Sequence, residues 1–130
     1  MTSIRLLALA AITASAMSAG VANAAGHDPK IDKTDWPASF TVGTASQGGT
    51  YFAYGTGWAN FVAENLGISG GSEITGGPMQ NMALVHTGEV AFGLTTMGPA
   101  RTSIEGNSPL APGLKMDNVC AMFPMYQTAF

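Results

Sequence analysis

Hydrophobic and polar positions follow two regular patterns along the chain, one typical of strands and one typical of helices. Residues 39–43 (SFTVG) have the β-branched and aromatic content of a short buried strand. After a glycine-containing loop, large apolar residues recur at steps of three and four, which predicts an amphipathic helix that ends at Gly67. This stripe consists of Tyr51, Tyr54, Trp58, Phe61, Val62 and Leu66. Gly55 and Gly57 weaken the helix and predict a close approach of its backbone to a neighbour.

The order of strand, turn and helix then repeats. Residues 72–75 predict a second strand, and Pro78 stands where the first residue of a helix tolerates proline. That helix ends at Gly88, and residues 90–95 predict a third strand. The inward-facing stripe of this second helix consists of Met79, Met82, Ala83 and His86. Strands that alternate with helices predict a parallel sheet in the order βαβαβ, and therefore an α/β fold.

The C-terminal part of the chain has a weaker pattern. Residues 98–113 are rich in Gly and Pro and predict a loop, and residues 119–126 predict a fourth strand. Cys120 lies in that segment, where we expect it to be buried. It is the single cysteine of the chain, so no internal disulfide can form and the fold must depend on its own core.

The N-terminal segment has the three parts of an export signal. Arg5 supplies a positive charge, residues 6–21 are mainly apolar, and Ala22-Asn23-Ala24 is a small-x-small cleavage site. The alternative, a membrane anchor, is disfavoured because the stretch is short and ends in small residues. We therefore expect a signal peptide over residues 1–24, cleavage after Ala24 and release into the periplasm. Residues 25–38 are polar and predict a flexible leader.

Length and charge limit the possible functions further. The chain has 130 residues, and its mature part is of a size for one domain. It carries 5 Lys and Arg residues against 8 Asp and Glu, a formal net charge of −3. Nucleic acids and anionic membranes bind clusters of Lys and Arg, so this balance argues against both as partners.

The loops after the first two predicted strands contain glycine pairs, Gly48-Gly49 and Gly76-Gly77. Loops that follow parallel strands emerge at the same edge of the sheet, where such folds bind ligands. Each loop leads into a helix, whose free N–H groups and partial positive charge favour an anion. Further hydroxyl and amide groups at this edge come from Ser46, Gln47, Thr50, Tyr51 and Asn81. Together they indicate a small ligand with a carboxylate or similar head, although each glycine pair alone is equally consistent with a simple turn.

The first loop partly resembles two catalytic motifs. Residues 43–50 match the spacing of a phosphate-binding loop, but Gly49 occupies the position of the required lysine. A serine hydrolase that uses Ser46 is the main alternative, because Ser46 lies between a strand and a helix with Gly48 two residues on. Thr44, however, occupies the first glycine position of that motif, and His86 on an apolar helix face is more often packed than catalytic.

Metal and cofactor chemistry find little support in the sequence. One cysteine and two distant histidines form no ligand cluster, so we expect neither a metal nor a cofactor. Arg101 is positioned to reach an anion at the end of the third strand, although a solvated surface arginine is the commoner case. The residues therefore favour a binding protein without catalytic activity.

Three segments carry a family resemblance. They are residues 40–51 (FTVGTASQGGTY), 75–81 (TGGPMQN) and 87–93 (TGEVAFG). Together they resemble the extracytoplasmic solute-binding subunits of TRAP transporters of the TAXI type. The resemblance implies a two-lobed periplasmic binding protein of the type II class. Such a protein closes on a small carboxylate such as glutamate or 2-oxoglutarate and delivers it to a membrane permease.

The resemblance also implies which residues bind the ligand. They are Ser46, Gly48, Gly49, Thr50 and Tyr51 in the first loop, and Gly77 and Asn81 in the second. Two departures stand out: the family often has a Gln-Ser-Asp-like string after the third strand, where this chain has Thr95-Thr96-Met97, and its members are more than twice as long. We therefore expect residues 39–130 to form a first lobe, with the second lobe missing.

Overall fold

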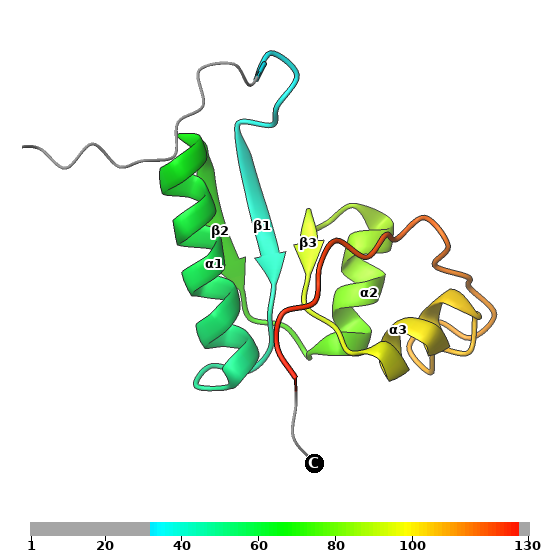
Figure 1. Ribbon diagram of the computed structural model, residues 1–130. Coiled ribbons are helices and arrows are strands. Elements are labelled where there is room, and N and C mark those ends of the chain that lie inside the picture. Colours follow the sequence, from blue (N-terminus) through cyan, green and yellow to red (C-terminus); the bar gives the residue numbers. More distant parts are fainter. Residues whose placement is uncertain (1–31, 128–130) are drawn as a thin grey trace, which may run out of the picture.

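The computed structural model describes residues 32–127, which form a parallel three-stranded sheet with helices packed against it (Figure 1). The strands are β1 (Ser39–Gly43), β2 (Ser69–Glu73) and β3 (Phe92–Gly93), and the helices are α1 (Thr50–Leu66), α2 (Pro78–Thr87) and α3 (Met97–Ile104). Both strand pairings are parallel. The predicted α/β fold with the order βαβαβ is confirmed. The predicted signal peptide and its cleavage site lie outside the described residues.

The order of the strands in the sheet is β2-β1-β3, so the central strand is the first one in the chain. Helix α1 packs along β1 and β2, whereas α2 packs along β3 and α3. In Figure 1, α1 accordingly lies on the β2 side of β1, and α2 and α3 lie on the β3 side. The connection from β1 to β2 therefore runs to one side of the central strand, and the connection from β2 to β3 crosses to its other side. The loops that follow β1 and β3 lead to helices on opposite sides of β1 from neighbouring positions at the carboxyl edge of the sheet. Such a switch point is where open α/β sheets bind ligands.

The core lies between β1 and α1. Phe40 and Val42 of β1 are buried with Ala59 of α1. Three rings meet edge to face: Trp58 lies 6.0 Å from Phe40 and 5.2 Å from Phe92 between ring centroids. This geometry is the preferred one for aromatic pairs, and it joins α1 to both β1 and β3.

Two predicted helices and their ends are confirmed. Gly67 and Gly88 follow α1 and α2 in the left-handed conformation, with φ of 67° and 78°. The close approach predicted at Gly55 is also present, because a Cβ atom there would lie 2.5 Å from Thr44 Cγ2. The same prediction is wrong for Gly57, where a Cβ atom would meet no other atom within 4 Å.

Two strand boundaries differ from the prediction. The second strand covers residues 69–73 instead of 72–75, and the third covers residues 92–93 instead of 90–95. The sequence of β2, SGGSE, lacks the hydrophobic pattern of a strand, and its Gly70 makes room for a core side chain. A Cβ atom on Gly70 would lie 2.5 Å from Cζ of Phe40.

The C-terminal predictions are wrong in two places. The expected loop over residues 98–113 contains α3, because Pro99 is the third residue of this helix, where no intrahelical N–H donor is needed. Residues 119–126 form no strand, and Cys120 is exposed. This segment packs by its side chains, since Met125 contacts the core and the Phe123 ring lies 5.9 Å from that of Trp58.

One member of the α1 stripe is also misplaced. Phe61 is 64% exposed, whereas the other five residues of the stripe are partly buried. Phe61 lies on the edge of the stripe, beyond the reach of the narrow three-stranded sheet.

Candidate functional site

A pocket of about 470 Å³ lies at the carboxyl edge of the sheet, at the switch point between β1 and β3. Its lining comes from three separate segments of the chain. The loop after β1 and the first turn of α1 contribute Ala45, Ser46, Gly49, Thr50 and Tyr51, and Thr96 and Tyr126 complete the lining. Four of the residues predicted to bind a ligand, namely Ser46, Gly49, Thr50 and Tyr51, are thus brought together here.

Two helices begin at this pocket. Gly49 is the N-cap residue of α1 and Thr96 is that of α3, and neither cap has a side-chain hydrogen bond to its helix. The first turn of each helix also lacks an acidic residue. The N–H groups of a first helical turn have no intrahelical acceptor and carry partial positive charge. An anion in the pocket would therefore be stabilised by both helices.

Tyr51 is the most distinctive side chain of the pocket. Its hydroxyl oxygen is buried, and it has no hydrogen-bond partner among residues 32–127. Burial raises the pKa of Tyr51 above its usual range, and the neighbouring Tyr126 raises it further. The nearby Thr96 side chain lowers this pKa to a smaller extent, but the two hydroxyls do not meet the geometry of a hydrogen bond. At neutral pH, Tyr51 therefore keeps its proton, and its hydroxyl can donate a hydrogen bond to a ligand.

The segment that ends near the pocket supplies Tyr126. Its ring centroid lies 6.4 Å from that of Tyr51 and 5.6 Å from that of Tyr54. In Figure 1 this segment, drawn in red, runs from beside β3 to the carboxyl edge of the sheet. Tyr126 was not predicted as a site residue, because only the tertiary path of the chain brings it to α1.

Thr96 was also missed as a lining residue. A sequence signal for it did exist, since threonine before a short segment with an early proline is typical of a helix N-terminus. Its place in the pocket follows from the strand order, which puts the loop after β3 beside the loop after β1.

The remaining predicted site residues lie outside the pocket lining. Gly48 is exposed in the loop after β1, with φ of 84°. Gly77 is buried, and a Cβ atom on it would lie 3.9 Å from Cβ of Ala45, so it lies behind the pocket wall. A ligand contact by Gly48, Gly77 or Asn81 stays a prediction from the resemblance.

Asn81 has a structural role at the base of the pocket. Its side chain is fully buried, and its Nδ2 donates to the carbonyl oxygens of Thr44 and Leu94, each at 2.7 Å. Its Oδ1 accepts a hydrogen bond of 2.6 Å from the hydroxyl of Thr75. Because these partners follow β1, β3 and β2 respectively, one amide joins the ends of all three strands.

Glycines at two strand ends make room for this amide. A Cβ atom on Gly43 would lie 2.8 Å from Oδ1 of Asn81, and one on Gly93 would lie 3.0 Å from Cβ of Asn81. Both distances are too short for a side chain to fit without movement. The loops that form the pocket therefore start from a tightly packed and hydrogen-bonded base.

The arrangement expected for a serine hydrolase is not assembled in the described residues. His86, the one histidine of residues 32–127, lies in the last turn of α2, and its ring contacts Asn118. Helix α2 begins at the carboxyl edge of the sheet and ends at the opposite edge. Ser46 and His86 are thus at opposite ends of the sheet. Arg101 pairs with Glu105 at 2.7 Å on the surface of α3 and does not line the pocket.

The described part of the chain offers neither a metal-binding cluster nor a membrane-spanning helix. Within residues 32–127, no three His, Cys, Asp or Glu side chains lie close enough together to hold a metal ion. None of the described helices has the length and apolar character needed to cross a membrane.

Comparison with known families identifies the broader group to which this fold and pocket belong. A model described as the NMT1-like family matches residues 42–130. The chain belongs to the NMT1-like family. This family is related to periplasmic binding proteins of the TRAP and ABC type, which indicates a general role in solute binding. Searches of curated proteins and of solved structures gave no match.

Membership of the NMT1-like family also bears on the expected partners. It indicates a small-molecule ligand and a membrane transporter in general terms. The matched range includes all of the pocket lining, from Ala45 to Tyr126. The match identifies the family as a whole, and it does not distinguish the TAXI type within it.

Proposed function

We propose that this chain is the solute-binding subunit of a TRAP transporter of the TAXI type, and that it binds a small carboxylate and delivers it to a membrane permease. The observation that carries this proposal is the pocket at the switch point of the sheet, which is lined by the start of α1 and by Thr96, the N-cap residue of α3. Glutamate and 2-oxoglutarate are the ligands that the family resemblance suggests. The N-terminal signal supports export to the periplasm.

The carboxylate would be held by neutral groups. N–H groups in the first turns of α1 and α3 would donate to its oxygens, with the hydroxyls of Ser46, Thr50 and Tyr51. A hydrogen bond to a charged group contributes about 1.5 to 3 kcal/mol, and a helix terminus about 0.3 to 1 kcal/mol. A few such bonds are sufficient for a reversible binding protein, because a Kd of 1 μM corresponds to about 8 kcal/mol. No reaction step is part of this role.

A charge placed at the start of α1 tests the proposal directly. Thr50 is the first residue of this helix, so Thr50→Asp should maintain or raise the melting temperature, because an acidic residue is favourable there. The same carboxylate would repel an anion in the pocket. We expect Thr50→Asp to weaken binding of 2-oxoglutarate or glutamate by at least about tenfold in isothermal titration calorimetry, as loss of 1.4 kcal/mol would do.

Matched controls separate this effect from a change in net charge. Asn60→Asp adds the same charge on the exposed side of α1 and should bind like the wild type. Thr50→Asn removes the hydroxyl without adding a charge, so it should weaken binding less than Thr50→Asp does. Wild-type affinity in Thr50→Asp would contradict the proposed site. Labelling of the chain by a fluorophosphonate, abolished by Ser46→Ala, would instead favour the serine hydrolase.

A further inference from the structure

One wall of the pocket is aromatic, and it joins two parts of the chain. The ring of Tyr126 lies nearly perpendicular to that of Tyr51, at an interplanar angle of 77°, and is tilted by 58° against that of Tyr54. Tyr126 is 39% exposed, so these contacts cover only part of its surface, and it lines the pocket. The wall therefore offers apolar ring surface to whatever enters.

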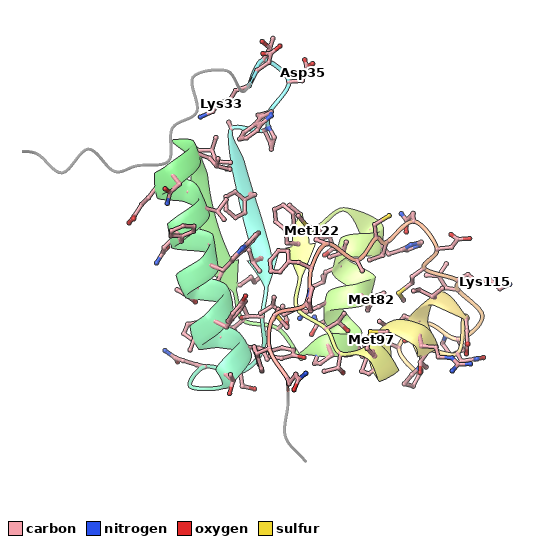
Figure 2. The ribbon with its side chains drawn as sticks, in the orientation of Figure 1. Lys33, Asp35, Met82, Met97, Lys115 and Met122 are labelled. Atoms are coloured by element: carbon pink, nitrogen blue, oxygen red, sulfur yellow. The ribbon has the colours of Figure 1, made fainter. Side chains whose placement is uncertain are left out.

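Among residues 32–127, no charged side chain lines the pocket. The basic residues of the described chain are elsewhere: Lys33 lies beyond the N-terminal end of β1 and Lys115 on the loop after α3, both far from the carboxyl edge of β1 (Figure 2). Arg101 is paired with Glu105 on α3. The lining thus provides donors for one carboxylate, but it provides no acid for an ammonium group and no cation for a second carboxylate.

A second charge on the ligand would find no oppositely charged side chain in this lining and would gain nothing over its contact with water. An apolar body on the ligand would gain both buried area and ring contacts at the same wall. The buried hydroxyl of Tyr51, which lacks a partner among the described residues, is available to one ligand oxygen.

We propose that Tyr126 contacts the ligand, and that the aromatic wall selects a monocarboxylate with an apolar or aromatic body over dicarboxylates and amino acids. This inference rests on the proposed function, since it takes the carboxylate site as given. It keeps the carboxylate that the family resemblance suggests, but it replaces glutamate and 2-oxoglutarate with monocarboxylates that have an apolar or aromatic body.

The test is calorimetric titration of the full chain with four probes: acetate, phenylacetate, glutamate and 2-oxoglutarate. We expect the wild type to bind phenylacetate about tenfold more tightly than any of the other three. Tyr126→Ala should remove the preference for phenylacetate over acetate while acetate affinity changes less than about twofold. Tyr126→Phe, which keeps the ring, should keep the preference.

Phe123→Ala is the matched control. Phe123 lies on the same segment and packs on Trp58, but it does not line the pocket. The Phe123→Ala variant should retain the preference for phenylacetate over acetate even if the C-terminal segment packs less firmly. Near-ultraviolet circular dichroism of Phe123→Ala and Tyr126→Ala reports that packing.

Three results would count against the inference or its basis, and they are distinguishable. Tighter binding of glutamate or 2-oxoglutarate than of phenylacetate overturns the proposed selectivity. An equal effect of Tyr126→Ala and Phe123→Ala on all probes overturns the ligand contact, because the segment would then act through folding. Failure of the wild type to bind any of the four probes contradicts the proposed function itself.

Discussion

At the scale of single residues, Asn81 decides the geometry of the ligand edge. Its buried side-chain amide donates to two strand-end carbonyls and accepts a hydrogen bond from the Thr75 hydroxyl. It therefore connects the ends of three strands that are far apart in the sequence. The resemblance suggests Asn81 as a ligand residue. The structure gives its side chain a full set of internal partners, so its effect on binding is expected to come through the position of the loops.

Asn81→Ala should therefore reduce stability strongly. It would remove the amide donor to the carbonyl of Leu94 and open a cavity, whereas the hydroxyl of Thr75 and the carbonyl of Thr44 keep a hydrogen bond of 3.0 Å to each other. A buried polar group left without a partner costs about 1 to 3 kcal/mol and the cavity adds to this, so we expect a loss of about 2 kcal/mol or more in urea unfolding. Asn60→Ala, at an exposed position of α1, should change stability by no more than about 0.5 kcal/mol. A loss below about 1 kcal/mol in Asn81→Ala would show that the three contacts do not hold the strand ends.

At the scale of elements, helix α1 combines two glycines with opposite roles. A Cβ atom on Gly55 would lie 2.5 Å from Thr44 Cγ2 and 3.1 Å from Leu94 Cδ1, whereas one on Gly57 would meet no atom within 4 Å. Gly55 thus sets how closely α1 approaches the base of the pocket. Gly57 is exposed and weakens the helix without any packing reason.

The two alanine variants of α1 should have opposite signs. Gly57→Ala should stabilise the chain by about 0.5 to 1 kcal/mol, which is the difference in helix propensity. Gly55→Ala should destabilise it by about 1 to 3 kcal/mol, because the added methyl overpacks the contact with Thr44. Thermal unfolding of both variants measures the difference, and a shift in the same direction for the two would contradict the close packing of α1 on the sheet.

At the scale of the whole molecule, export and ligand site are separate properties of the chain. The export signal is local: a charged start, an apolar run and Ala22-Asn23-Ala24. The pocket, by contrast, needs the loop after β1, the loop after β3 and the C-terminal segment to meet. A change in one property should leave the other intact.

The exported chain should begin at Ala25. Amino-terminal sequencing of the protein from a periplasmic extract tests this, and Ala24→Leu, which places a large residue at the cleavage position, should leave the precursor uncut. The control Asn23→Gln alters only the middle residue of the motif and should be cut normally. A wild-type product that still begins at Met1 and sediments with membranes would mean that the segment is an anchor.

The sequence by itself determined the α/β class, the limits of α1 and α2, and four of the pocket residues. These features depend on local physics: the 3.6-residue period of Tyr51 to Leu66, glycines at helix ends, and backbone donors at the start of α1. Such signals are complete within about twenty residues, so they can be recognised without the fold.

Only the tertiary structure decided the strand order, the role of Asn81 and the presence of Tyr126 at the pocket. In sequence, the loops after the first and second strands look like equal partners, but the order β2-β1-β3 brings the loop after β3 to the pocket and leaves Asn81 behind it. At Gly70 of β2 a side chain would collide with Phe40, and Tyr126 is placed by its ring contacts with Tyr51 and Tyr54. These features depend on packing between segments that are distant in the sequence, and no local sequence pattern predicts that packing.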